Sequence, residues 1–344
     1  MSINDLRKQS FIFIFLIFVA VTVLSGCGAH VNISLSNSLK KSDAKEFNIE
    51  KTAVEPIKRI DIDASTADIM LIEDDNYYVE FHYYYWEKEP EYMEKEGAIK
   101  FDDSGIFPKS YSINFDIDNY VKVYLPKDAK LDEIYINTAS GDVSLQDFLA
   151  DTLELQVAYG DLSIENVSVQ KASINMASGN GDIQDLNVQN LILKDSYGNI
   201  TLKNINTSNI TDTIDLKKSD MEIALASGKC TVNNLISNTL EINNSYGDVT
   251  GKGFAVTEFN SDLSSGDLKI TESTLDKADV NNSYGNVTLL LAGKEEDYEL
   301  DLDTSYGKID VNNKSYDKSL KKGSSTTKSI TASLSSGNIQ LQFE

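Results

Sequence analysis

The chain has 344 residues, a formal net charge of −23 and two cysteines, Cys27 and Cys230. A surface this acidic repels phosphate backbones, so nucleic-acid binding is excluded as a working hypothesis. Two cysteines also provide no disulfide framework. Beyond residue 26 the chain contains one arginine, Arg59, which leaves few bidentate clamps for phosphate or carboxylate ligands.

The N-terminus reads as a targeting segment. Arg7 and Lys8 precede an apolar stretch over residues 11–24, which is typical of a secretory signal. The residues that close it, Leu-Ser-Gly-Cys at 24–27, resemble the lipobox of bacterial lipoproteins, in which the cysteine is lipidated. We therefore predict a lipoprotein signal peptide over residues 1–26 and an acyl chain such as palmitate on Cys27. An uncleaved signal anchor is the alternative, since the apolar run is long enough to span a bilayer if it extends through Ala29. Both place the remaining chain outside the cytoplasm on a bacterial membrane.

Residues 27–55 are largely polar and show no sustained apolar period, which predicts a flexible tether. Within residues 56–344 glycines recur mostly 19 residues apart, with intervals of 30, 22 and 30 residues before Gly228, Gly307 and Gly337. They are Gly141, Gly160, Gly179, Gly198, Gly228, Gly247, Gly266, Gly285, Gly307 and Gly337. A fixed period of this length indicates one supersecondary unit stacked on copies of itself.

Apolar residues alternate on both sides of each glycine. Before Gly141, for example, Ile134 and Ile136 share one face of a strand, and Val143 and Leu145 follow it in the opposite parity. A glycine at the change of parity fits a tight corner that a Cβ would forbid. The pattern predicts an all-β, parallel β-solenoid of about 19 residues per turn with inward aliphatic columns. Because parallel crossovers are overwhelmingly right-handed, we expect a right-handed β-helix.

The residue before the glycine alternates between serine and tyrosine. Ser140, Ser178, Ser227 and Ser265 interleave with Tyr159, Tyr197, Tyr246 and Tyr284, and Tyr306 and Ser336 close the series. The full repeat is therefore two turns. We interpret the serines as leaving room for the tyrosine rings, since rings on every turn would have to stack about 4.8 Å apart.

The regular period is interrupted in three places. We predict insertions near residues 87–113, 206–216 and 314–328, the last two as loops. A first, degenerate turn over residues 60–71 lacks the glycine, as terminal repeats often do. The segment near 87–113 is expected to cover its open edge.

The run Val121 to Pro126 followed by Thr-Ala-Ser-Gly-Asp-Val at 138–143 resembles the start of the bacterial "putative adhesin" family of β-strand repeats, which includes LiaG-like envelope proteins. The Ser-Ser-Gly-Asn-Ile run at 335–339 is similar to the last turn of that family. The resemblance implies an envelope role for residues 57–344. It supplies no catalytic residue and no cofactor.

Aromatic residues are densest between residues 77 and 86. Alternation predicts that Phe81, Tyr83 and Tyr85 belong to the core of a strand, while the other face points outward. Aromatic side chains on an outer face can grip a sugar or a protein partner. We take Tyr78, Tyr84 and Trp86 as the candidate binding patch.

Aspartate and asparagine share the position after the glycine, as in Asp142 and Asp161. This column could bind calcium, but Lys229 and Lys308 occupy it too, and we favour bonds from these side chains to their own turns. Cys230 falls on an inward column and is expected to be a buried apolar residue rather than a nucleophile. No catalytic residue, metal ligand or cofactor motif is predicted.

Two functions remain open. The first is a non-enzymatic, lipid-anchored surface protein whose solenoid presents a binding face to an envelope polymer or protein. The second is a polysaccharide lyase or hydrolase, which would need basic residues or paired acids flanking the bond. The scarcity of arginine and the lack of an isolated acidic cluster favour the first.

Overall fold

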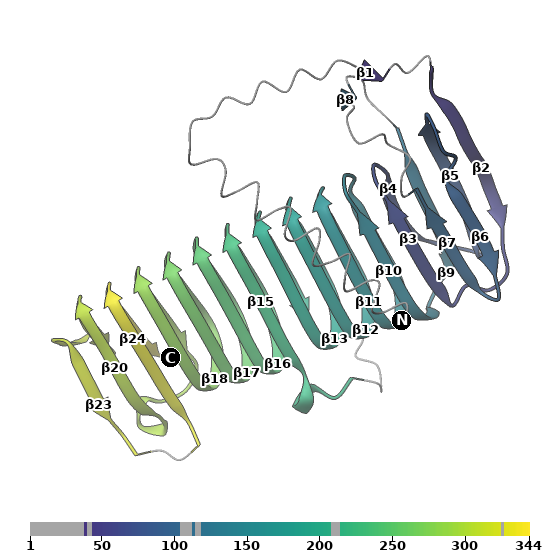
Figure 1. Ribbon diagram of the computed structural model, residues 1–344. Coiled ribbons are helices and arrows are strands. Elements are labelled where there is room, and N and C mark those ends of the chain that lie inside the picture. Colours follow the sequence, from purple (N-terminus) through teal and green to yellow (C-terminus); the bar gives the residue numbers. More distant parts are fainter. Residues whose placement is uncertain (1–37, 40–42, 104–111, 114–117, 208–213, 325–326) are drawn as a thin grey trace, which may run out of the picture. The chain divides into compact units, whose positions relative to one another are not determined.

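The computed structural model describes residues 38–39, 43–103, 112–113, 118–207, 214–324 and 327–344. The helical elements η2 (Leu216–Lys218) and η3 (Glu295–Asp297) are single 3-10 turns. The short strands β1 (Ser38–Leu39) and β8 (Ser112–Ile113) pair in parallel in a small unit of their own. All other strands form one 23-stranded sheet in a second unit. This second unit is a parallel β-solenoid, which confirms the predicted fold class (Figure 1); right-handedness stays a prediction.

The middle of the solenoid consists of turns stacked in parallel. Their strands are β10 (Ala129–Thr138), β11 (Val143–Tyr159), β12 (Leu162–Ser178), β13 (Gly181–Tyr197), β14 (Ile200–Ile205), β15 (Asp220–Ser227), β16 (Cys230–Tyr246), β17 (Val249–Ser265), β18 (Leu268–Tyr284) and β19 (Val287–Leu291). Residues one turn apart are neighbours: Leu155 lies beside Ile174, and Ile174 beside Leu193. Strands such as β12 continue for 17 residues from one glycine to the next.

The glycines lie at the corners where these strands end. At Gly247 the backbone has φ +139°, a conformation that L-residues with a Cβ rarely adopt. A Cβ there would also overlap the carbonyl oxygen of Gly228 on the neighbouring turn. The corner thus needs glycine for two reasons, its dihedral angles and the close approach of the next turn.

A second corner lies six residues after the glycine and was not predicted. Its residues have positive φ: Asp147, Asn166, Asp185, Asn204, Asn234, Gly253 and Glu272. Asparagine, aspartate and glycine tolerate this left-handed conformation better than other residues. Side chains here also bond from turn to turn, as in Asn204 Nδ2 donating to Asp185 Oδ1 at 3.0 Å. Each long strand bends at this corner without losing its pairing, which is why it remains one strand.

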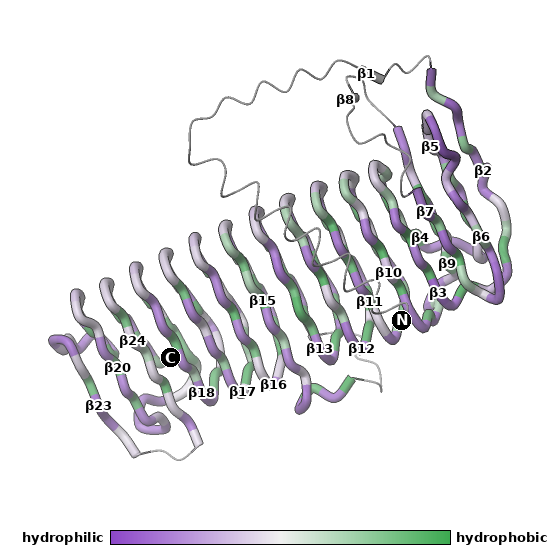
Figure 2. Tube along the Cα trace, viewed as in Figure 1, coloured by the Kyte–Doolittle hydropathy of each residue, from purple (hydrophilic) through white to green (hydrophobic). Residues whose placement is uncertain are grey.

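The interior consists of the predicted aliphatic columns. Ile136, Leu155, Ile174, Leu193 and Ile223 are all fully buried. Figure 2 shows hydrophobic and hydrophilic residues alternating along the tube. The same columns bury one another along the stack, so apolar burial supplies the main stabilising term.

The N-terminal end adds strands that the period did not show. They are β2 (Lys45–Ala53), β3 (Arg59–Ala64), β4 (Asp68–Asp74), β5 (Tyr78–Tyr85), β6 (Glu91–Lys95), β7 (Ala98–Asp102) and β9 (Tyr120–Pro126). The degenerate turn, β3 and β4, is not the outermost one, because β7 pairs in parallel with β3 and β9 with β4. Antiparallel β5, β2 and β6 continue the sheet beyond them. The predicted tether therefore ends before β2, which is folded against β5.

The C-terminal end of the solenoid also has short strands beyond the regular turns. Its strands are β20 (Glu299–Tyr306), β21 (Ile309–Val311), β22 (Lys314–Tyr316), β23 (Ser319–Lys322), β24 (Ser329–Ser336) and β25 (Ile339–Phe343). The last turn of the chain is inserted into the stack: β24 pairs with both β18 and β20, and β25 with both β19 and β21 (Figure 1). Gly337 therefore follows Gly285, and Gly307 is outermost.

The segment 314–328, predicted as a loop, contains two strands instead. β22 and β23 pair antiparallel with β21 and β20, whose outer edges would otherwise lack partners. Unpaired edges invite association with other chains, so short antiparallel strands protect this end. In the segment 206–216, residues 208–213 lie outside the described residues; the turns on either side remain in register, since β13 pairs with β15 and β14 with β16.

Candidate functional site

The predicted patch lies on and just after β5. Phe81 and Tyr83 on the inner face are fully buried, which confirms the predicted inner set. Tyr78 and Tyr84 lie on the other face of β5, but both are half-buried, as is Trp86 beyond its end. The patch is therefore less exposed than the sequence suggested.

The outer face of β5 is locked into a network with β9. The carboxylate of Glu80 accepts hydrogen bonds from the hydroxyls of Tyr120 at 2.8 Å and Tyr124 at 2.6 Å. The hydrogen bond to the Glu80 carboxylate, together with burial, raises the pKa of Tyr120 to about 12. Lys51 Nζ lies over the rings of Tyr78 and Tyr124 at 4.6 and 4.5 Å. These partners hold the aromatic rings in place and use up most of the polar groups on this face.

A second set of aromatic residues is far more exposed. The tyrosines that precede corner glycines have 54 % to 78 % of their surface exposed: Tyr159, Tyr197, Tyr246, Tyr284 and Tyr306. We call this set the tyrosine ridge. Several long strands end on it, at the arrowheads along one edge of the stack in Figure 1.

The inserted last turn makes the tyrosine ridge regular. In chain order Tyr284 and Tyr306 would stand on adjacent turns, which breaks the alternation with serine. In the structure Ser336 lies beside both, so serine and tyrosine alternate to the end of the ridge. The alternation is visible in the sequence, where it predicts a packing rule; the structure shows that it also forms an exposed surface.

The residue after each glycine forms a hydrogen-bonded column that we call the corner ladder. Asp142 Oδ1 accepts from the backbone N–H of Asp161 at 2.8 Å, and Asp161 Oδ1 from that of Asn180 at 2.7 Å. The same bond links Asp267 to Asn286 at 2.7 Å. The favoured prediction, bonds within one turn, was therefore wrong: the Asp and Asn side chains of this column bond the next turn of the stack.

A buried polar position lies three residues before the glycine. Asn244 Nδ2 donates to the Gly228 carbonyl at 2.8 Å, and Asn282 Nδ2 donates to that of Gly266 at 2.9 Å. Asp195 occupies the same position, with 3 % of its surface exposed. Neither of its carboxylate oxygens has a well-formed hydrogen bond in the described structure. Burial raises the pKa of Asp195 to about 6, although the nearby N–H groups of Tyr197 and Ser196 lower it in part.

Asp103 is the second strongly perturbed acid and lies near β3 and β5. Its carboxylate accepts from the Ser65 backbone N–H and from Ser65 Oγ, both at 2.7 Å, and from the Tyr83 hydroxyl. Burial raises its pKa to about 6 in spite of the Ser65 bonds. With 1 % of its surface exposed, Asp103 fixes the N-terminal turns and has no route to a ligand.

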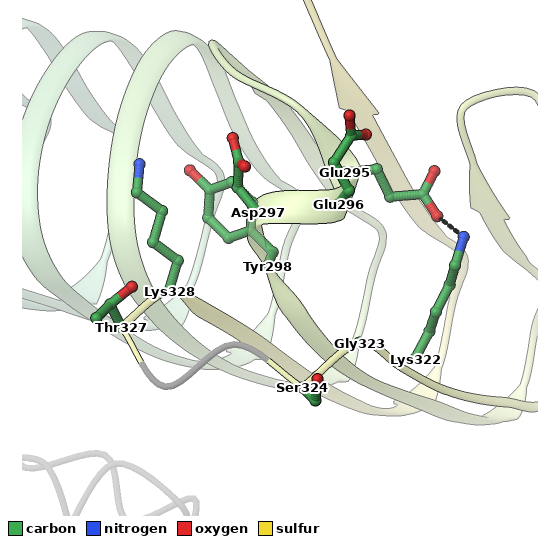
Figure 3. A pocket seen from close by; sticks show the side chains of 9 residues that line it. All are labelled: Glu295, Glu296, Asp297, Tyr298, Lys322, Gly323, Ser324, Thr327 and Lys328. Carbon is green, nitrogen blue, oxygen red and sulfur yellow. Dashed lines mark hydrogen bonds and ion pairs between the residues drawn. The ribbon is translucent and has the colours of Figure 1, made fainter.

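One surface depression of about 630 Å³ lies near η3 and is lined by charged residues (Figure 3). Both lysines that line it contact acids. Lys322 forms an ion pair with Glu295, and Lys328 contacts Asp276 at 3.3 Å. The Tyr298 hydroxyl donates to the Leu275 carbonyl at 2.8 Å. The depression is thus held together by its own residues.

Cys230 is fully buried, as predicted, and burial raises the pKa of its thiol to about 12. Over the ranges that the structure describes, no group of three or more His, Cys, Asp or Glu residues could hold a metal ion. Within those same ranges no helix is long and apolar enough to cross a membrane. Cys27 and the predicted signal peptide lie outside the described residues.

The fold and the ridge together define a repeat protein of the parallel β-solenoid class with an extended outer surface. A family model described as Toastrack DUF4097 matches residues 57–213 and again 172–342. The chain therefore belongs to the Toastrack DUF4097 family.

Three solved structures are similar to this chain. A "putative adhesin" from Bacteroides fragilis is 13 % identical with a TM-score of 0.34, covering 87 % of this chain and 97 % of its own. A "putative lipid binding protein" from Parabacteroides distasonis is 13 % identical with a TM-score of 0.38, covering 88 % and 98 %. A "putative cell adhesion protein" from Clostridium sporogenes is 11 % identical with a TM-score of 0.23, covering 88 % and 100 %. No curated protein matches the chain.

Proposed function

We propose that this protein is a non-enzymatic, lipid-anchored surface protein of the bacterial cell envelope, with the tyrosine ridge as its binding face. The exposure of the five ridge tyrosines, 54 % to 78 % of each side chain, carries the proposal. Exposed aromatic residues in a row are costly to leave in water and are enriched at recognition surfaces. The adhesin-like role is proposed on this ridge alone.

The lipid anchor is proposed on the lipobox-like residues 24–27. Acylation of Cys27 would attach the folded solenoid to the outer face of the membrane, with the polar residues before β2 as a spacer. The LiaG-like assignment within the family is proposed on the resemblance of residues 121–126 and 138–143. Labelling with radioactive palmitate in a bacterial host, lost in a Cys27→Ser variant, tests this part.

The non-enzymatic role is supported by the surroundings of the acids. Those of the corner ladder use Oδ1 to bond the next turn, and the two acids with strongly raised pKa, Asp103 and Asp195, are buried. A general acid must reach the bond that it protonates. The polysaccharide lyase or hydrolase alternative would release reducing ends or unsaturated products from a panel of glycans.

A pull-down from bacterial envelope extract tests the binding face. The bait is the full chain in detergent, as wild type, as a Tyr246→Ser/Tyr284→Ser variant, and as a Tyr84→Ala/Trp86→Ala variant. We expect the ridge variant to lose the envelope component that the wild type retains. The β5 variant should keep it, because its rings are half-buried. The reverse result would place the binding face on β5.

A further inference from the structure

We propose that the tyrosine ridge binds a neutral, extended β-1,4-linked glycan lying along the axis of the solenoid, with one tyrosine ring under every second sugar. This inference deepens the proposed surface role and rests on it. It names the chemistry of the partner from three features of the ridge: its spacing, its polar groups and its charge.

The spacing of the ridge is set by the strand pairing. Tyr246 lies in register between Ser227 and Ser265, so the next tyrosine is two turns away. Paired strands are about 4.8 Å apart, which places the ring positions about 9.5 Å apart along the axis. In an extended β-1,4-linked chain each sugar is turned over relative to the one before, so the same face recurs at every second sugar. The length of that disaccharide is close to two turns of the solenoid.

The polar groups beside the ridge suit a polyol. Two residues after each tyrosine, the corner ladder presents exposed side chains such as Asn199, Asp248 and Asn286. In each aspartate the ladder bond uses Oδ1, as in Asp248 accepting from the Asp267 N–H at 3.1 Å. The second carboxylate oxygen is then available to accept from a sugar hydroxyl. Aromatic platforms with acceptors at their side bind sugar faces and hydroxyls together.

Charge excludes the polyanionic polymers of the envelope. The chain carries a net charge of −23, and aspartates outnumber lysines on the corner ladder. A phosphate- or uronate-bearing polymer would be repelled at this edge. A neutral chain meets no such barrier.

A proline-rich peptide is the competing occupant, because one turn of polyproline II helix is about 9.3 Å long. Such a peptide presents carbonyl acceptors and lacks the N–H groups of its prolines. It would therefore need donors from the protein. The corner ladder offers the second carboxylate oxygens of its aspartates beside the Nδ2 groups of its asparagines. A hydroxyl can donate to the first and accept from the second, which favours the hydroxyl-rich glycan.

The fold itself provides a conservative variant. Serine occupies the ridge position on every second turn, with the same pairing and the same corner glycine. Tyr246→Ser and Tyr284→Ser should therefore remove the rings without disturbing the stack. Tyr246→Ser combined with Ser265→Tyr keeps the number of tyrosines but moves one ring by a single turn.

The test measures binding of chitin oligosaccharides to the full chain in detergent by calorimetry. We expect the octasaccharide to bind about 10-fold more tightly than the tetrasaccharide, because it spans more rings. The Tyr246→Ser/Tyr284→Ser variant should lose about 10-fold in affinity for the octasaccharide. The exchanged variant should lose a similar factor, with its melting temperature recorded to show that it is folded. Malto-octaose, which is α-linked and coiled, should not bind.

Several outcomes would overturn the proposal. They are equal affinity for the α-linked octasaccharide, unchanged affinity in the Tyr→Ser variant, or binding of a polyproline peptide in place of the glycan. Undiminished binding by the folded exchanged variant would show that ring spacing is irrelevant. If glycans fail while the envelope pull-down still depends on Tyr246 and Tyr284, the glycan class is wrong and the surface role stands. If both fail, the proposed function fails as well.

Discussion

Gly247→Ala is expected to lower the free energy of unfolding by about 3 kcal/mol or more, which combines the strain of a positive φ with the loss of inter-turn hydrogen bonds. The alanine would have to adopt φ +139° and would push its Cβ against the Gly228 carbonyl. Since the contact is with backbone, it can be relieved only by separating two turns. That separation would weaken bonds such as Gly228 N–H to the Tyr246 carbonyl, now 2.9 Å. Urea denaturation monitored by circular dichroism measures the effect.

Gly181→Ala is the matched control. Gly181 is buried on a strand and has no positive φ. Its Cβ would meet the ends of two flexible side chains, Ile200 Cδ1 at 2.8 Å and Met176 Sδ at 3.4 Å. Such side chains can move aside, so a loss of about 1 kcal/mol is expected. Equal losses in the two variants would contradict the special role of the corner.

Asp195→Asn is expected to stabilise the protein by about 2 to 3 kcal/mol at pH 7. The carboxyl of Asp195 has a pKa of about 6 in the folded chain, against 3.8 ordinarily. Each unit of pKa corresponds to about 1.4 kcal/mol, so holding the charged form in the fold costs roughly 3 kcal/mol. The asparagine removes the charge, and its amide can donate to the Gly179 carbonyl as Asn244 does to that of Gly228. Chemical denaturation at several pH values measures the gain.

The sign of the pH dependence follows from the raised pKa. The folded state holds the Asp195 proton more tightly than the unfolded chain, so this contribution to stability falls as the pH rises from about 4 to 6 and is constant above. At pH 4 the variant and the wild type should be nearly equal. Asp103 titrates in the same window but affects both proteins alike. An Asp195→Ala control separates the loss of the charge from the gain of the amide donor. A lower free energy of unfolding for Asp195→Asn than for the wild type at pH 7 would contradict the account.

The fold could be predicted from the sequence because every turn has the same requirements for side-chain packing and for backbone conformation at the corner. Inward columns such as Ile136 and Leu155 recur at fixed distances from a glycine that no other residue can replace at the corner. The second corner was missed although its signal is present: Asp147 and Asn166 stand at the same distance after their glycines. Left-handed conformations at these positions follow from residue type alone.

The ends of the stack could not be predicted from the period. Which strand lies beside which depends on long-range pairing, and β24 enters between β18 and β20 only after the chain has passed the outer turn. The antiparallel strands β2 and β5 cover the sheet edge at the N-terminal end of the stack. That edge forms only when the turns have assembled, so the period of the sequence does not indicate it. The one local clue was the break in alternation at Tyr284 and Tyr306.

The tyrosine ridge was not predicted as the candidate site for a related reason. The local density of aromatic residues in the sequence favoured Tyr78, Tyr84 and Trp86 as the candidate patch. In the structure, however, the clustered rings pack on one another and on Lys51. The ridge tyrosines are spread along the sequence and gather only when the turns stack. Exposure, not density, distinguishes them.

The continuity of the tyrosine ridge depends on the inserted last turn, and engineered disulfides test that insertion most directly. In a Cys27→Ser background, Asp279→Cys/Thr331→Cys joins residues that are paired neighbours, as does Asp301→Cys/Thr331→Cys. Adjacent strands lie within the Cα separation that a disulfide bridges, whereas residues two turns apart, about 9.5 Å, do not. The structure predicts that both of these pairs oxidise readily and that Asp279→Cys/Asp301→Cys does not. Ready oxidation of Asp279→Cys/Asp301→Cys, with Asp279→Cys/Thr331→Cys remaining reduced, would show that the turns stack in chain order and would contradict the account.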